Sequence, residues 1–183
     1  MANLMAKSPC EGLLPVEFDG VVLRELSMAT VTSITPFKGQ EKKSSKALEA
    51  ALGLLMPKAN WAAENEGARA IWFGQGRILL IGADAPEALN GCAAMTDQSD
   101  AWIMIQLEGP ASRDVLARLV PIDFRRSAFE LEQTARTMLQ HMSVSITRVG
   151  DDAFQIMAFR SMAATCVHEL EIAMKVVAAR DTY

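Results

Sequence analysis

The chain has 183 residues, of which 50% are hydrophobic and 22% charged, and its 18 basic and 22 acidic residues give a net charge of −4. This composition is typical of a globular domain with a real core and excludes an intrinsically disordered chain. It also argues against a nucleic-acid binder, because no run of basic residues exceeds two, as in Arg125-Arg126.

The sequence carries no sign of a membrane or secretory protein. No stretch approaches the roughly 18 consecutive apolar residues that a membrane-spanning helix needs. Residues 1–10 contain no continuous apolar segment of the kind found in secretory signals. The three cysteines, Cys10, Cys92 and Cys166, are odd in number and widely spaced, which favours reduced thiols over a disulfide framework. We therefore expect a cytoplasmic protein.

The N-terminal segment is punctuated by residues that favour turns, namely Pro9, Gly12, Pro15 and Gly20. This pattern predicts an irregular arm over residues 1–20, followed by a single α+β domain over 21–183. That domain begins with short β-favouring pieces between Val21 and Thr35.

The next part of the chain combines a helix with a hairpin. Apolar residues at helical spacing predict a helix that is capped by Ser44 or Ser45 and ends near Met56. Two β-rich runs within residues 70–81 flank Gly74-Gln75-Gly76 and predict a tight hairpin.

The second half of the chain alternates strands and helices. The expected elements are a short helix over 86–90, a strand over 102–107, a helix from Pro110 to Pro121, strands over 134–142, 144–149 and 154–159, and a helix over 161–179. The buried face of the last helix is expected to contain Met162, Cys166, Leu170, Met174 and Val177. The whole pattern predicts an α+β fold with a mostly antiparallel sheet flanked by helices.

A search for metal ligands or a nucleophile finds no recognisable site. His168 follows Cys166 by two helical positions, so their side chains point about 200° apart and do not easily share a metal. His141 lies near a strand end without ligand spacing around it. Ser99 and Ser112, which have acidic neighbours, are interpreted as turn and helix-start residues.

Glycine and carboxylate pairs also have ordinary interpretations. Gly74-Gln75-Gly76 lacks the rest of a dinucleotide-binding motif and precedes a strand. Gly150-Asp151-Asp152 is interpreted as a solvated turn rather than a cation site. Glu130 and Glu132 share a face if that segment is extended, but no partner marks them as an acid–base pair. We therefore assign no catalytic, cofactor-binding or metal residue to the chain.

Four segments in the second half of the chain carry a resemblance to a known family: 96–102 (TDQSDAW), 107–123 (LEGPASRDVLARLVPID), 134–142 (TARTMLQHM) and 154–165 (FQIMAFRSMAAT). In order and spacing they resemble the gamma subunit of heterotetrameric sarcosine oxidase. The match continues more loosely upstream through 23–26 and 47–57, so it covers most of the chain.

The same pattern is similar, more distantly, to the folate-binding fold of the aminomethyltransferases. Asp97-x-Ser99, Gly109-Pro110 and Phe154-x-Ile156 hold positions that recur in that wider family. The family places a Gly-Gly pair and a catalytic carboxylate between the two strands after the first helix. Here that connection is expected to be His141 to Ser145, without glycine or acid, so no catalytic or folate-contact residue is carried over.

The resemblance implies a non-catalytic subunit of an enzyme complex. Heterotetrameric sarcosine oxidases oxidise sarcosine with oxygen to glycine and hydrogen peroxide and pass the one-carbon unit to tetrahydrofolate. The resemblance places FAD, FMN, NAD, tetrahydrofolate and zinc on partner subunits and no cofactor on this chain. The expected partners are the alpha, beta and delta subunits, alpha most directly, with neither nucleic acid nor membrane.

A docking chain needs aromatic or arginine anchors on an apolar surface. The candidates are Trp61, Trp72, Trp102, Arg136 and Arg160, together with the arm over 1–20. Each also has an ordinary interpretation, as a core tryptophan, a solvated arginine or a frayed terminus.

Two other functions stay open at this point. One is a stand-alone folate-binding or aminomethyltransferase-like protein. The other is a protein-interaction module unrelated to amine metabolism.

Overall fold

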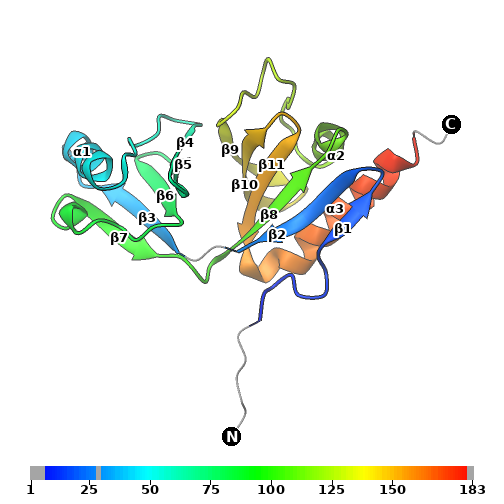
Figure 1. Cartoon of the computed structure of the whole chain (residues 1–183), viewed down its shortest axis with the longest axis horizontal. Helices are drawn as coiled ribbons and strands as arrows, with labels where there is room; N and C mark the ends of the chain where they lie inside the picture. The colour runs from blue at the N-terminus through cyan, green and yellow to red at the C-terminus, as the bar shows by residue number, and fades with distance from the viewer. Residues whose placement is uncertain (1–6, 28–29, 181–183) are drawn as a thin grey trace, which may run out of the picture.

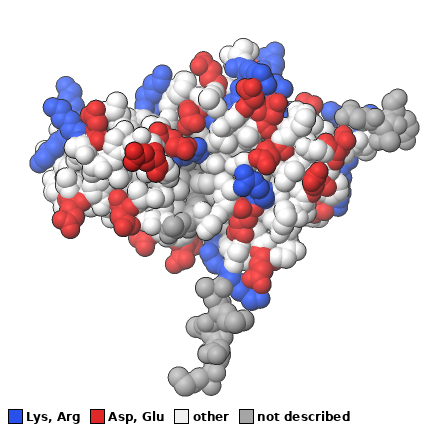
Figure 2. Space-filling model, viewed as in Figure 1, with Lys and Arg blue, Asp and Glu red and all other residues white. Residues whose placement is uncertain are grey.

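In the computed structural model, which describes residues 7–27 and 30–180, the chain forms two antiparallel sheets side by side, with the helices on their outer sides (Figure 1). In the same view, charged side chains are spread over both halves, and the strip of surface between them is mostly uncharged (Figure 2). The predicted α+β class with mostly antiparallel strands is confirmed, but the strands form two sheets instead of one.

The six-stranded sheet has the order β1 (Val16–Phe18), β2 (Val21–Leu26), β8 (Trp102–Glu108), β11 (Ala153–Phe159), β10 (Met142–Gly150) and β9 (Thr134–Leu139). All neighbouring strands run antiparallel. One face is covered by α2 (Ser112–Leu119) and α3 (Ala163–Ala178), which contact each other, and the short 3₁₀ turn η2 (Arg160–Met162) leads into α3.

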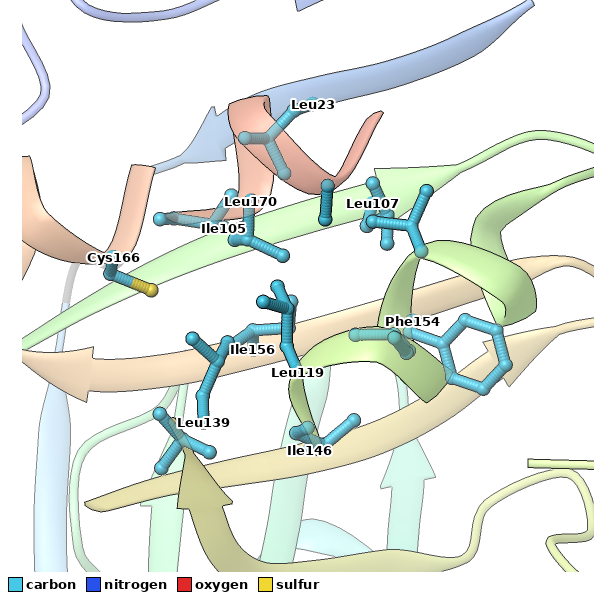
Figure 3. Packing of buried hydrophobic residues seen from close by; sticks show 14 of the residues in the cluster. Leu23, Ile105, Leu107, Leu119, Leu139, Ile146, Phe154, Ile156, Cys166 and Leu170 are labelled. Carbon is cyan, nitrogen blue, oxygen red and sulfur yellow. The ribbon is translucent and has the colours of Figure 1, made fainter. Parts of the chain in front are cut away.

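The core of this half lies between the sheet and these two helices (Figure 3). Ile105 and Leu107 alternate along β8 and meet Cys166 and Leu170 of α3, and all four are fully buried. The predicted buried face of the last helix is confirmed except at Met162, which is 43% exposed because it precedes the helix. Alternation in the strand and helical spacing in α3 therefore produce one continuous apolar layer.

The predicted irregular arm over 1–20 is wrong at its end, because Val16–Phe18 forms β1 and pairs with β2. Asp19 and Gly20 connect these strands with φ angles of 48° and 71°. An Asp-Gly pair is a strong signal for a two-residue hairpin turn, because both residues tolerate positive φ. The sequence thus contained the signal for this hairpin. Residues 1–6 of the arm lie outside the described residues.

The five-stranded sheet has the order β4 (Ala62–Asn65), β5 (Ala68–Gly74), β6 (Arg77–Ile81), β3 (Val31–Pro36) and β7 (Ala93–Asp97). The predicted hairpin around Gly74-Gln75-Gly76 is confirmed as β5 and β6. Helix α1 (Glu41–Leu52) and the 3₁₀ turn η1 (Glu87–Leu89) cover the outer face, where Leu48 and Leu89 are buried.

Helix boundaries differ from the predictions at two places. Helix α1 begins before Ser44, whose hydroxyl donates instead to the Cys92 carbonyl at 3.1 Å, and it ends at Leu52. Gly53 ends this helix because it adopts φ 63°, a left-handed conformation typical of helix C-termini. Helix α2 begins at Ser112, two residues after the predicted Pro110.

The strand boundaries are also revised in the second half. The strand predicted over 134–142 ends at Leu139, and the next begins at Met142, so Gln140 and His141 form a tight turn. Gln140 has a φ of 51°, a conformation that the sequence pattern did not signal.

A third apolar cluster joins the two sheets. Ile71, Leu79 and Ile81 of the five-stranded sheet pack with Met104 and Met157 of the six-stranded sheet. Backbone hydrogen bonds extend the junction, from Ala62 N to Glu132 O at 2.8 Å and from Thr134 N to Asn60 O at 2.9 Å. The inner faces of the sheets are therefore held in contact by both apolar packing and backbone pairing.

Candidate functional site

The inner face of the six-stranded sheet consists of the side chains that alternate with its core residues. Strand register pairs Trp102 with Phe159, Met104 with Met157, and Gln106 with Gln155. On the neighbouring strands, Arg136 and Met138 of β9 pair with Ser145 and Ser143 of β10. The face therefore changes along the strands from an aromatic and apolar end to a polar end.

At the aromatic end, four side chains from four strands form what we term the aromatic–arginine cluster: Phe73 of β5, Trp102 of β8, Arg136 of β9 and Phe159 of β11. Arg136 Cζ lies 3.9 Å from the centre of the Phe73 ring and 5.7 Å from that of Trp102. Trp102 meets Phe73 edge-on at 5.0 Å and stacks on Phe159 at 4.4 Å. The ring faces attract the guanidinium through their quadrupoles and hold it at the junction of the sheets.

The charge of Arg136 is not neutralised by any carboxylate in residues 7–27 and 30–180. Its Nη2 donates to Ser143 Oγ at 3.1 Å, and none of the ion pairs among those residues includes it. Partial burial, with a smaller effect of the positive charge on Arg77, lowers the pKa of Arg136 from its ordinary value. A partly buried guanidinium without a counter-ion gains from a carboxylate supplied from outside the chain.

The rim of the cluster is apolar and open to solvent. Phe159 and Met138 are each 43% exposed, and they lie on the same face of the six-stranded sheet as Arg136. Trp102 beneath them is buried, and its indole Nε1 has no hydrogen-bond partner within the described chain. An arginine with exposed aromatic and methionine side chains is the composition enriched at protein–protein interfaces.

Of the predicted docking residues, the structure places Trp102 and Arg136 in this cluster. Trp72 lies on the opposite face of β5, where it pairs with the buried Ile78. Trp61 is half-buried beneath the Lys58 ammonium at 4.3 Å. Sequence reasoning missed Phe73, Phe159 and Met138, although strand alternation places Phe159 on the same face as Met157.

Arg160 and the arm form a separate feature beside the cluster. Arg160 is exposed, donates to the Lys7 carbonyl at 2.9 Å, and lines a hollow of about 350 Å³ with Ser8, Glu25 and Trp102. Within residues 7–20 the arm packs on its own chain, because Cys10 is buried in the core. This part of the arm is therefore committed to the fold.

At the polar end, a hollow of about 590 Å³ lies between the two sheets. Arg69 is 9% exposed there and donates to Glu64 through Nε at 3.1 Å and to the Gln155 side chain. Gln155 in turn donates to Gln106 at 3.3 Å. Burial raises the pKa of Glu132, whose Oε2 is buried with no hydrogen-bond partner in the described chain. These polar groups mostly satisfy one another across the gap.

The predicted turn and helix-start serines have structural roles. Ser99 Oγ accepts from Val31 N at 3.0 Å and donates to Asp97, and Ser112 Oγ donates to the Asp152 carbonyl at 3.0 Å. Asp152 itself ion-pairs with Arg113 at 3.2 Å. These contacts tie loops to neighbouring elements.

The two histidines lie on the surface, whereas the three cysteines are buried. His141 is exposed in the turn between β9 and β10, and His168 is exposed on α3, whereas Cys166 of the same helix faces the core. In the chain from 7 to 27 and from 30 to 180, no group of three or more His, Cys, Asp or Glu side chains is placed to hold a metal ion. None of the helices described for this chain is long and apolar enough to cross a bilayer.

The connection expected at His141 to Ser145, between β9 and β10, is shorter in the structure. It is the two-residue turn Gln140-His141, and neither side chain is an acid. In the hollow between the sheets, Arg69 is already bound to Glu64 and Gln155.

Comparison with known proteins places this geometry in context. A family described as the GCVT N-terminal domain matches residues 76–178. The chain is 25% identical over 169 residues to a protein named sarcosine oxidase subunit gamma from Corynebacterium sp. strain U-96, covering 88% of this chain and 82% of the relative. It is 29% identical over 188 residues to a protein of the same name from Arthrobacter sp., covering 93% and 90%.

Two solved structures share the arrangement of elements. A chain of the heterotetrameric sarcosine oxidase from Corynebacterium sp. U-96, in complex with pyrrole 2-carboxylate, superposes with a TM-score of 0.79 at 26% identity, covering 94% of this chain and 96% of that chain. The glycine cleavage system aminomethyltransferase T from Bartonella henselae gives a TM-score of 0.58 at 18% identity, covering 82% of this chain and 45% of that one. The second likeness shows a shared fold.

Proposed function

Because this chain belongs to the GCVT N-terminal domain family and resembles sarcosine oxidase gamma subunits over most of its length, we propose that it is a non-catalytic gamma subunit of a heterotetrameric sarcosine oxidase. In this role it supports the assembly of a cytoplasmic complex. The complex oxidises sarcosine to glycine with formation of hydrogen peroxide and passes the one-carbon unit to tetrahydrofolate. The chain thereby takes part in sarcosine catabolism.

In this proposal the chemistry belongs to the partner subunits. FAD, FMN, NAD, tetrahydrofolate and zinc are carried by the alpha, beta and delta chains, and this chain contacts alpha most directly. Its own contribution is attachment.

The observation that carries the proposal is the aromatic–arginine cluster. Its rim exposes Phe159 and Met138, and the described chain supplies no carboxylate for Arg136. Burying this rim in a subunit interface would stabilise a complex through apolar contact and charge pairing.

Co-expression with candidate alpha, beta and delta chains tests the proposal. With an affinity tag on alpha, we expect this chain to co-purify in stoichiometric amount. The complex is expected to form peroxide when sarcosine is added. When this chain is omitted, that activity is expected to have a shorter half-life at raised temperature. Turnover by the isolated chain, or its absence from the purified complex, would contradict the proposal.

The second candidate is a stand-alone folate-binding protein, and the polar hollow between the sheets is the observation that favours it. Glu132 offers an unpartnered oxygen there, next to Gln106 and Gln155. Titration of the isolated chain with tetrahydrofolate, followed by calorimetry, separates the two functions. Saturable binding that Glu132→Gln weakens would support the second one.

A further inference from the structure

We infer that the Arg136 guanidinium receives a carboxylate side chain from a partner subunit of the complex, and that Phe159 and Met138 contact the apolar surface around that carboxylate. This inference rests on the proposed function and names the chemistry of its docking surface. The partner residue is an aspartate or glutamate set among apolar neighbours.

The first argument is charge. Arg136 is half-buried, and its Nη2 donates a hydrogen bond to a neutral hydroxyl, that of Ser143, at 3.1 Å. The positive charge of Arg77 lies close enough to contribute to the lowered pKa of Arg136, after the larger effect of burial. Several other arginines of the described chain, though not all, have carboxylate partners, as Arg69 has Glu64 and Arg125 has Asp123. A carboxylate is the complementary group for such a site.

The second argument is geometry. Phe73 supports the guanidinium at 3.9 Å, and Trp102 and Phe159 continue the aromatic stack to the surface. The rings come from three strands of two sheets, so the site is rigid before binding. A guanidinium held over a ring keeps N–H donors free at its edges for a bidentate acceptor. A preorganised donor loses little conformational entropy when the partner binds.

The third argument is the surrounding surface. Phe159 and Met138 are exposed on the same face as Arg136, so a free carboxylate ion would leave these side chains in water. A carboxylate carried on a protein surface would bury them together with the ion pair. Exclusion of water by this rim strengthens the pair, as it does at interface hot spots. The rim thus favours a protein over a small-molecule carboxylate.

The experiment measures binding of the full chain to the complex of the other three subunits, by surface plasmon resonance at low and moderate salt. We expect Arg136→Gln to weaken binding by about tenfold to a hundredfold and to reduce its salt dependence. Arg136→Lys keeps the charge without the bidentate geometry and is expected to retain part of the affinity. Phe159→Ala is expected to weaken binding while leaving the salt dependence unchanged. Arg125→Gln, an exposed arginine near α2 on the other face, is the matched control.

A second readout avoids dependence on a variant that fails to fold. Phenylglyoxal modification of the wild-type chain, mapped by mass spectrometry, is expected to be slower at Arg136 in the complex than in the free chain. Arg125 should react equally in both states.

Several outcomes would overturn the inference. One is an Arg136→Gln variant that binds with the affinity and the salt dependence of the wild type. Another is a phenylglyoxal reaction at Arg136 that is equally fast in the free chain and in the complex. Protection of Arg136 by acetate in the free chain as complete as that by the complex would show a small-molecule site instead. If the wild-type chain does not bind the other subunits at all, the proposed function itself fails, and this result is distinct from the others.

Discussion

Arg69 of β5 donates a hydrogen bond to the side-chain oxygen of Gln155 of β11, although the two residues are 86 positions apart in the sequence. The same guanidinium binds Glu64 of β4 through two nitrogens. A single side chain therefore connects the two sheets at their polar end, while the aromatic–arginine cluster connects them at the other end.

Arg69→Met is expected to lower the free energy of unfolding by about 1–2 kcal/mol, because Gln155 and Glu64 lose a shared donor. This loss of stability is expected to be smaller than for a fully buried ion pair, because the Glu64 side chain is 48% exposed and is hydrated again when Arg69 is removed. Urea denaturation followed by circular dichroism measures it. Arg125→Met, at an exposed ion pair, is the control and should be indistinguishable from wild type. Equal stability of all three proteins would contradict the role of Arg69.

Glu132→Gln is expected to raise stability at neutral pH. Burial raises the pKa of Glu132, with Glu64 adding to the rise and Arg69 opposing it. The stability that Glu132 contributes is therefore present below the ordinary pKa of glutamate and is lost as the pH rises through the higher value in the folded chain.

Urea denaturation at a series of pH values tests this dependence. The advantage of Glu132→Gln over wild type should shrink as the pH falls toward about 4. Glu130→Gln, on an exposed neighbour, controls for the substitution itself. A difference that stays constant across the series would rule out titration of Glu132 as its source.

Gly109→Ala is expected to destabilise the chain by about 2–4 kcal/mol. Gly109 has a φ of 131°, and an added Cβ would lie 2.2 Å from the Gly20 carbonyl oxygen and 2.8 Å from Val21 Cα. The backbone of Gly20 and Val21 cannot move aside for the added methyl group as a flexible side chain could. Gly91→Ala, at φ 85° with nothing within 4 Å, is the control and should cost about 1 kcal/mol. Thermal and urea unfolding of both variants would compare them, and equal costs would contradict the close approach.

Cys10 and Cys166 are expected to resist alkylation in the folded protein. Burial raises the pKa of each thiol to about 12, with Glu25 adding to the effect at Cys10. Because the thiolate is the reactive form, iodoacetamide at about pH 8 should label both slowly. Mass spectrometry of native and urea-unfolded samples measures the difference. Rapid labelling of Cys10 in the native sample would show that residues 7–20 do not pack as described.

Local patterns predicted the elements well where one period dominates. The buried face of α3 followed from helical spacing at Cys166, Leu170, Met174 and Val177, and all four are buried. The β5–β6 hairpin followed from β-rich runs around two glycines. The Asp19-Gly20 hairpin and the left-handed Gly53 were equally local, and the sequence already carried both signals. Predicted element boundaries were less accurate where the boundary residue makes a tertiary contact. Ser44, for example, was predicted as a helix cap but donates to the Cys92 carbonyl.

The sequence by itself determined most of the elements, the fold class and the family resemblance, because alternation, helical spacing and turn residues act between near neighbours, whereas the strands β1, β4 and β7 were not predicted. Only the tertiary structure decided that the strands divide into two sheets and that Arg136 lies over Phe73 beside Trp102 and Phe159. Trp102 and Arg136 were already docking candidates in the sequence, but no local pattern connected them with Phe73 or Phe159. They form a site because strands distant along the chain pair and pack at one junction, and this proximity depends on the free energy of the whole fold rather than on any local segment.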